Sequence, residues 1–546
     1  MSDLSVYSGK GTNIVIVAGG LGSRLAPLTN HIPKVLVNIG KNTGYVEMVR
    51  YWSKQTNLER GSLTVIVHSA YKSLVAEYHK MYFPTIPLIV KTVDVANGSA
   101  HAILSTCDHL EGREVLFSWC DVLPVDEIKI DTIGGRYANS NVIFTNYNGS
   151  CRYGLGIDFS GRGVKPFLDT YERGGVFGLY YIHRYEPSHV ESSDGQDFIE
   201  VIEQFGECRE HRLEEIIDFG DMPKLMRVRE KADSAREFNS VEFVGDYVLK
   251  QATNDQGKAI IEREIKWYQT LDELVDRRKA PRPSVPKTWI STDKSGFFMS
   301  RVKGVPIWKA WAGLSPIDRR YVFNQIIEQQ QNIFNLGQRP VAPEQVRRDV
   351  GVEACEKLLG RYAEIKGVID SFGPITHVNG LQLSGRSVET IINLLGERLQ
   401  KFYAENPPDY GFIHGDLQMS NSMVDLDTLK VTIIDPRGYF GKTIGAGLAD
   451  YDRAKLLYAL DGYDLFNYST SFHISAIEDG YLDFDFERPD RSGIEADVKA
   501  SFDPVHNLWL AVCWIGLAQY IRSDVVKCVA SHYHGLALAE HLLSVS

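Results

Sequence analysis

The stretch from Phe412 to Gly438 reads F-I-H-G-D-L-Q-M-S-N-S-M-V-D-L-D-T-L-K-V-T-I-I-D-P-R-G. Two short apolar runs in this region, Tyr410–Ile413 and Val431–Ile434, each end in a polar cluster. The first cluster is His414-Gly415-Asp416, with Asn421 five residues after Asp416, and the second begins at Asp435. Short apolar runs that stop at turn residues are typical of buried strands. The pattern therefore predicts two strands whose ends carry Asp416, Asn421 and Asp435.

These three residues suit the transfer of a phosphoryl group from a nucleotide. The reaction needs one carboxylate to orient and deprotonate the attacking hydroxyl, and oxygen ligands that hold Mg²⁺ against the phosphates. Asp416 suits the first task. Asn421 and Asp435 suit the second, because each can reach one metal from a strand end or loop. The alternative is that these residues are only polar turn residues at the ends of two strands. In that case all three, at their observed spacing, would match the phosphoryl-transfer pattern by chance.

The pattern H-G-D-x-x-x-x-N followed by I-D resembles the aminoglycoside phosphotransferase and choline kinase family, a relative of the protein kinases. The resemblance implies a bilobal α+β kinase-like domain over residues 233–546, with ATP and Mg²⁺. It implies that Asp416 is catalytic and that Asn421 and Asp435 bind the metal. The chain lacks D-F-G and A-P-E, which argues against a protein kinase.

The same resemblance places nucleotide contacts on an earlier hairpin and helix. Val241–Lys250 alternates as two hairpin strands would, and Ala259–Leu271 is amphipathic at helical spacing. Lys250 would meet the nucleotide phosphates and pair with Glu264 on the helix, for which Glu262 is the alternative. The alternative without a role in nucleotide binding is that Lys250 and Glu264 form an ordinary surface ion pair.

The N-terminal part of the chain carries a second phosphate-binding pattern. The apolar run Asn13–Val17 predicts a buried strand, and it leads into A-G-G-L-G-S-R-L at residues 18–25. Glycines directly after a strand let backbone N–H groups approach phosphate closely. Arg24 and Lys34 add positive charge where a triphosphate would lie. A plain Rossmann-type loop is the structural alternative.

The combination G-G-x-G-x-R-L-x-P-L-T followed by P-K resembles the sugar-phosphate nucleotidylyltransferases. The resemblance implies a Rossmann-like α/β domain over residues 1–232, with a mixed, mostly parallel sheet. The chain departs from the family's pattern at two positions. It has Asn97 where the family usually has glycine, and it has Cys120 in place of the glycine before the aspartate, here Asp121. The implied site comprises catalytic Arg24 and Lys34; nucleotide-binding Gly19, Gly20, Gly22, Ser23, Asn97, Gly98 and Ser99; substrate-binding Lys165; and the metal ligands Asp121 and Asp218.

The reaction that this second resemblance implies is a nucleotidyl transfer. A phosphate oxygen of the substrate attacks the α-phosphorus of a nucleoside triphosphate, and pyrophosphate leaves. The attacking phosphate is already ionised, so no general base is needed. Catalysis then consists of positioning and of charge neutralisation by Arg24, Lys34 and Mg²⁺.

Length and composition exclude several other classes of protein. A chain of 546 residues is too long for one core, and its net charge of −11 gives no basic surface for nucleic acid or anionic membrane. The seven cysteines show no C-x-x-C spacing, so we expect neither a zinc site nor disulfides. We also expect a cytoplasmic location, where thiols stay reduced. The longest apolar run, Leu508–Leu517, is too short to span a bilayer.

Together the two resemblances predict a bifunctional enzyme. The kinase half would phosphorylate a small alcohol, and the transferase half would join that phosphate to CTP, UTP, GTP or dTTP. A sugar is the first expectation for the alcohol, giving a nucleotide sugar for surface polysaccharide. Choline, ethanolamine or a polyol, giving a CDP-linked product, is the alternative, and a regulatory nucleotide-binding role for one half is another. The base, the alcohol and the oligomeric state, a homo-oligomer included, stay open.

Overall fold

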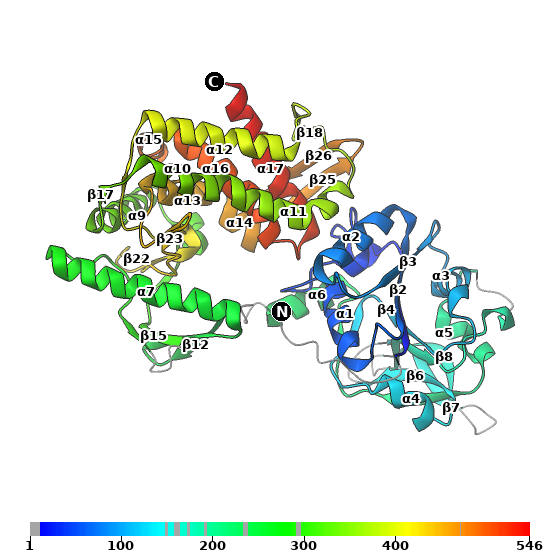
Figure 1. The fold of residues 1–546 in the computed structure, drawn as a ribbon. Helices are drawn as coiled ribbons and strands as arrows, with labels where there is room; N and C mark the ends of the chain where they lie inside the picture. The colour runs from blue at the N-terminus through cyan, green and yellow to red at the C-terminus, as the bar shows by residue number, and fades with distance from the viewer. Residues whose placement is uncertain are drawn as a thin grey trace. The chain divides into compact units, whose positions relative to one another are not determined.

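The computed structural model describes residues 11–147, 151–157, 164–171, 175–190, 194–232, 239–290, 296–469 and 471–545. The chain divides into two compact units, one formed mainly by residues up to 234 and the other mainly by residues from 235 onward. Figure 1 follows the chain through both. Within the described ranges, no helix combines the length and apolar character that crossing a membrane requires.

A mixed sheet forms the centre of the N-terminal unit. Its strand order is β10-β6-β9-β4-β1-β2-β3, and the β7–β8 hairpin attaches at β9. β1 runs parallel to β2 and β4, and β9 runs antiparallel to β4 and β6. The strands are β1 (Asn13–Ala18), β2 (Ser62–His68), β3 (Leu88–Val93), β4 (Val115–Trp119), β6 (Asn141–Asn146), β7 (Cys151–Ile157), β8 (Val164–Tyr171), β9 (Gly175–Ile182) and β10 (Cys208–Arg212). This arrangement confirms the predicted mixed, mostly parallel sheet.

The sheet is the hydrophobic core of this unit. Every residue of β1, β6 and β9 is buried, which fits their nearly continuous apolar sequences. A small antiparallel pair, β5 (Val122–Pro124) with β11 (Ile216–Asp218), brings residue 218 beside residue 122. The helices are α1 (Gly44–Gln55), α2 (Lys72–Tyr82), α3 (Ser99–Thr106), α4 (Ile130–Arg136), α5 (Phe198–Val201) and α6 (Met222–Ala232).

The second unit begins with an antiparallel sheet of order β12-β13-β15-β14. The predicted hairpin is present as β12 (Asn239–Val244) and β13 (Tyr247–Ala252), with Gly245 in the left-handed region at φ 60°. β14 (Thr288–Ile290) and β15 (Gly296–Ser300) complete the sheet. The predicted helix is longer than its apolar pattern, because α7 (Asp255–Arg278) begins at an Asn254 cap and lies along the sheet in Figure 1.

Helices form the remainder of the second unit. α16 is apolar on all sides and is almost entirely buried between its neighbours. The longer helices are α9 (Pro316–Leu336), α10 (Pro343–Gly351), α11 (Lys357–Asp370), α12 (Val388–Glu405), α13 (Ala449–Leu460), α16 (Pro504–Tyr520) and α17 (Val525–Ser544). Short helices are α8 (Ile307–Ala310), α14 (Tyr463–Tyr468) and α15 (Glu495–Ser501).

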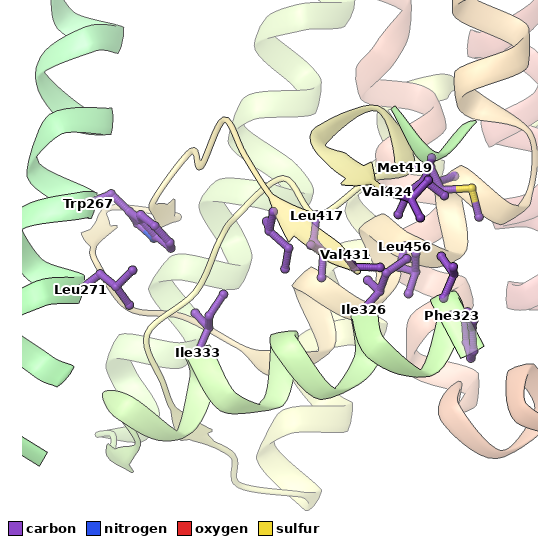
Figure 2. Packing of buried hydrophobic residues seen from close by; sticks show 14 of the residues in the cluster. Trp267, Leu271, Phe323, Ile326, Ile333, Leu417, Met419, Val424, Val431 and Leu456 are labelled. Carbon is purple, nitrogen blue, oxygen red and sulfur yellow. The ribbon is translucent and has the colours of Figure 1, made fainter. Parts of the chain in front are cut away.

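One core connects α7, α9 and α13 with the segment around Asp416. Trp267 and Leu271 of α7, Ile326 of α9, and Leu456 of α13 are all buried in it. Figure 2 shows Leu417, Met419, Val424 and Val431 of the central segment pointing into the same cluster. The polar residues at 414–421 are therefore held in place by Leu417 and Met419, which lie between them in the sequence and are buried in this core.

The strand expected at Tyr410–Ile413 is much shorter than predicted. Only β20 (Asp409–Tyr410) forms, pairing with β17 (Arg339–Pro340), and one further bridge joins Gly411 to Gly447. Beyond that point the backbone makes other bonds, since the amide of Phe412 donates to the carbonyl of Phe334. The second run does form a strand, β22 (Val431–Ile433), which pairs with β21 (Ser422–Val424).

Candidate active sites

Two parallel strands of the N-terminal unit end side by side at one pocket. β1 leads into Gly19, β4 leads into Cys120, and Val17 lies opposite Trp119 in the ladder. Ligands bind at such carboxyl ends in open α/β sheets. The pocket has a volume of about 590 Å³. Its lining includes Gly19, Gly20, Gly22, Ser23, Arg24, Lys34, Asn97, Gly98, Ser99, Asp121 and Asp218.

Lys34 supplies buried positive charge to this pocket. Its ammonium group donates to the carboxylate of Asp121 and, at 3.0 Å, to the carbonyl of Gly220. The guanidinium of Arg24 lies 3.9 Å from the same carboxylate, with 71% of its side chain exposed. One cation is thus fixed by its partners, and the other can reach a phosphate from the open side of the pocket.

Two carboxylates converge around Gly220. A Cβ atom at this position would lie 2.8 Å from Oδ2 of Asp121 and 3.1 Å from Oδ1 of Asp218. The amide of Gly220 donates to Asp218 at 2.8 Å. Mg²⁺ is commonly held by one or two carboxylates together with substrate phosphates. The pair Asp121 and Asp218 fits that donor set, although they are 97 positions apart in the sequence.

Lys224 belongs to this site and has no counterpart among the residues predicted from the sequence. Its ammonium group lies 2.6 Å from Asp218, and its side chain lines the pocket. It is the third residue of α6. The spacing of six residues from Asp218 matches no recognisable motif, so only the fold reveals the pair.

Replacing Gly220 with alanine tests the convergence of the two carboxylates. The added methyl group would displace Asp121, Asp218 or both, and displacements of about 1 Å can reduce turnover on the order of 10²-fold. We expect a loss of this size in pyrophosphate release. Gly135→Ala is the matched control, because a Cβ there meets no atom within 4 Å. Equal activity of the two variants would contradict the placement of the metal ligands.

The segment 97–99 lies against a neighbouring loop of the same unit. The Asn97 amide donates to Asp194 at 3.1 Å, and the Ser99 hydroxyl accepts from the amide of Phe198 at 2.8 Å. Gly98 has φ 84°, and a Cβ there would lie 2.2 Å from the carbonyl of Gln196. The left-handed conformation of this segment is thus at Gly98, and Asn97 is not one of the described residues with a positive φ. Lys165 lies on β8, and its side chain is outside what the structure describes.

The second unit holds a buried cation between two carboxylates. The ammonium group of Lys250 on β13 lies 2.6 Å from Glu264 on α7 and 3.0 Å from Asp435. Glu262, the alternative partner, is exposed. Burial alone would lower the pKa of Lys250, but Asp435 and Glu264 outweigh it and the pKa is raised. Lys250 is thus charged and held in place, as phosphate binding requires.

Asp416 and Asn421 form a closed local arrangement. The amide nitrogen of Asn421 donates to the backbone carbonyl of Asp416 at 2.9 Å and to its carboxylate at 3.1 Å. The ring of His414 bridges two segments, with Nδ1 accepting from the amide of Asp416 and Nε2 beside the carbonyl of Ile434 at 2.9 Å. Burial lowers the pKa of His414, so the neutral ring fits this role.

Asp435 lies two residues after β22, and the residue before it is bonded to Asn421. The amide of Ile434 donates to the carbonyl of Asn421 at 2.9 Å, which ties the two segments together. Asp435 has φ 57°, an uncommon conformation for a residue other than glycine. Such strain persists only where the surroundings enforce it, and it concentrates at functional sites. An amide oxygen and a carboxylate brought together in this way fit Mg²⁺ held against phosphates.

α13 holds the segment around Asp416 in place through Asp452. The carboxylate of Asp452 accepts from the amides of His414 at 2.8 Å and Gly415 at 2.6 Å. Burial raises the pKa of Asp452 to about 7. These bonds give Asp452 a structural role, because they hold the backbone of His414 and Gly415 in place.

Lys455 lies beside Asp416 in this unit, and the sequence interpretation assigned it no role. Its ammonium group lies 3.1 Å from Asp416, and 13% of its side chain is exposed. Burial opposes ionisation of Asp416, but Lys455 and Arg437 outweigh it and lower the pKa of Asp416. Lys455 follows Asp452 by three residues, the spacing that places two side chains on one face of a helix, and that signal was available.

Comparisons with known proteins identify the N-terminal unit. Residues 13–133 match the family model described as nucleotidyl transferase. A 2-aminoethylphosphonate cytidylyltransferase from Lancefieldella rimae is 28% identical over 173 residues, which are 31% of this chain and 66% of the relative. The matched segment thus spans slightly less than two thirds of that protein. The N-terminal unit contains a nucleotidyltransferase domain.

Solved structures with some likeness cover the same part of the chain. HddC from Yersinia pseudotuberculosis is 19% identical with a TM-score of 0.34, covering 40% of this chain and 99% of its own. The CTP:phosphocholine cytidylyltransferase from Streptococcus pneumoniae is 14% identical with a TM-score of 0.31, covering 40% and 99%. The family match, and not these structures, carries the assignment of the domain.

Proposed function

We propose that the chain is a bifunctional enzyme. Its C-terminal part, from about residue 233, would transfer the γ-phosphoryl group of ATP to a small alcohol. Its N-terminal part, up to about residue 232, would transfer a nucleotidyl group to the resulting phosphate and release pyrophosphate. The product of one reaction is the substrate of the other, which is a chemical reason for the two parts to share a chain.

The observation that supports the transferase most strongly is the shared pocket after β1 and β4. Ten residues that the glycine-rich pattern and its family predicted line it together, from Gly19 to Asp121, and Asp218 joins them from β11. The name of the Lancefieldella relative favours CTP as the nucleotide and a phosphorus-containing amine as the acceptor class. A sugar phosphate is the other acceptor class.

In the transferase, the chain's own residues would position and neutralise charge. Backbone N–H groups of Gly20 and Gly22 would face the triphosphate, and Arg24 would reach it from the open side. Lys34 would hold Asp121 in place and stabilise negative charge on the departing pyrophosphate. Mg²⁺ bound by Asp121 and Asp218 would supply further charge neutralisation at the phosphates.

In the kinase, Asp416 would accept the proton of the attacking hydroxyl. Its lowered pKa keeps the carboxylate ionised near neutral pH, and Asn421 fixes its orientation. Lys250 would bind nucleotide phosphates while Glu264 holds it in place. Mg²⁺ bound by Asn421 and Asp435 would neutralise the charge that develops on the phosphates.

The two activities can be measured separately on the full-length protein. ADP release from ATP is followed with pooled free sugars, choline, ethanolamine and polyols, and pyrophosphate release is followed with CTP and the corresponding phosphates. We expect both signals, and we expect both to disappear when Mg²⁺ is removed with chelator and to return when it is restored. Metal-independent turnover of either kind would contradict the proposed ligand sets. Lack of pyrophosphate release with CTP, UTP, GTP and dTTP would contradict the transferase.

A further inference from the structure

A further hollow in the N-terminal unit adjoins the pocket after β1 and β4. It has a volume of about 1120 Å³, and its lining comes from the start of α1, from β5 and β11, and from α6. We call it the α6 hollow. Asp218 and Lys224 line both the α6 hollow and the pocket after β1 and β4, so the two spaces meet at this ion pair. The α6 hollow is large enough to receive a small substrate.

Lys224 lies at one end of a row of contacts that begins with Lys34. Lys34 donates to Asp121 and to the carbonyl of Gly220. The amide of Gly220 donates to Oδ1 of Asp218, and the ammonium group of Lys224 lies 2.6 Å from Oδ2 of the same carboxylate. Both proposed metal ligands therefore stand between the two lysines. Each lysine faces a different side of the metal site.

Nucleotidyl transfer requires different partners on these two sides. At a reacting phosphorus atom the attacking and leaving oxygens lie roughly in line. The acceptor phosphate must therefore approach from the side opposite the pyrophosphate. Arg24 and Lys34 are at the pyrophosphate end of the proposed reaction, which leaves the end at Lys224 for the acceptor. The side chain of Lys224 is 28% exposed, so a phosphate in the α6 hollow could reach its ammonium group.

α6 adds further positive charge to the wall of this hollow. Lys224, Arg227 and Lys231 follow one another at spacings of three and four residues, which places them on one side of the helix. All three line the α6 hollow, and Arg227 and Lys231 are exposed. The acidic residues of the lining, except Glu230, belong to other segments. A row of cations that leads to a reacting centre raises the local concentration of an anionic substrate.

We propose that Lys224 binds the phosphate group of the acceptor, and that the α6 hollow receives the rest of that molecule. This inference rests on the proposed transferase and adds a substrate-binding residue to it. One acceptor phosphate oxygen forms the new bond to the α-phosphorus, the bond from the α-phosphorus to the bridging oxygen breaks, and its electron pair leaves with pyrophosphate. Lys224 keeps its proton and offsets the repulsion between the acceptor phosphate and the triphosphate. The role expected for Lys165 is compatible with this, because a phosphate dianion can bind more than one cation.

The test measures KM for both substrates of pyrophosphate release, using the full-length protein, Mg²⁺ and CTP with phosphorylethanolamine, phosphorylcholine or glucose 1-phosphate. Lys224→Met removes the charge and keeps most of the apolar stem. We expect it to raise KM for the phosphate compound by about 10- to 100-fold, as for a lost hydrogen bond to a charged group, and to leave KM for CTP little changed. Lys224→Arg should restore most of the loss, because a guanidinium group also binds phosphate.

The charge on the rest of α6 is tested with the double variant Arg227→Ala, Lys231→Ala. These side chains are exposed and lie along the way to Lys224, so they act through the field and not through the reacting atoms. We expect a lower kcat/KM for the phosphate compound at low salt and a smaller difference at high salt, where exposed charges are screened. Arg113→Ala is the matched control, because Arg113 is exposed and is not in the lining of either space.

Calorimetry supplies a measurement that does not depend on turnover. The phosphate compound is titrated into protein that holds Mg²⁺ and a CTP analogue with a methylene group between its α- and β-phosphorus atoms. Lys224→Met should weaken binding of the phosphate compound and not of the analogue. Weaker binding of Mg²⁺ and the analogue with normal binding of the phosphate compound would overturn the inference, because Lys224 would then only support Asp218. No pyrophosphate release by the parent protein with CTP, UTP, GTP or dTTP would remove the transferase and this inference together.

Discussion

The Asp416→Asn variant is expected to lose phosphorylation of the alcohol by a factor on the order of 10³ while retaining pyrophosphate release. An asparagine keeps the shape of the side chain but cannot accept the proton of the attacking hydroxyl, and positioned general bases contribute about 10²–10⁴-fold. The bond from Asn421 to the backbone carbonyl of Asp416 survives the change. ADP release and pyrophosphate release from one preparation provide the two measurements.

The control for this variant is Asp427→Asn, an aspartate 77% exposed in the same region, whose ion pair with Lys303 is at the surface. Exposed ion pairs of this kind contribute little to stability. The control should retain both activities, and the thermal unfolding of all variants should show that they are folded. A folded Asp416→Asn variant that lost both activities would contradict the assignment of Asp416 to the kinase alone.

The Lys34→Ala variant is expected to show the opposite pattern. Removing the ammonium group takes away positive charge next to the departing pyrophosphate and leaves the buried carboxylate of Asp121 with only the more distant Arg24. Losses of one such electrostatic contact are about 10²–10³-fold in kcat. Pyrophosphate release should fall by that amount, while ADP release from ATP and the free alcohol should be unchanged.

Lys54→Ala is the matched control, because Lys54 is exposed on α1 of the same unit. It should leave pyrophosphate release unchanged. A Lys34→Ala protein that unfolds at the same temperature as the parent but keeps full pyrophosphate release would exclude Lys34 from the transferase reaction.

The sequence predicts those parts of both sites whose residues lie close together along the chain. The glycine-rich loop, Arg24 and Lys34 follow β1 within a few turns, and Asp416 and Asn421 lie in one segment. Glu264 could be predicted as the partner of Lys250 because helical spacing puts it on the buried face of α7. These are local patterns, and local backbone chemistry determines them.

Other parts of the sites depend on contacts between distant segments. Lys224 reaches the pocket that holds Asp121 because β11 pairs with β5, and no motif marks Lys224 in the sequence. The run Tyr410–Ile413 was wrongly expected to be a full strand, because its apolar residues enter the core from a loop whose amides bond to Phe334 and Asp452.

The most direct measurement of the central claim follows one phosphoryl group through both reactions. The full-length protein is incubated with ethanolamine, Mg²⁺, CTP and ATP labelled with ¹⁸O in its γ-phosphoryl group, and the products are read by mass spectrometry. Two sites acting in sequence predict a CDP-linked alcohol that carries the label in the phosphate next to the alcohol, with unlabelled pyrophosphate. A labelled alcohol phosphate that never becomes CDP-linked, or a CDP-linked product without the label, would contradict the account.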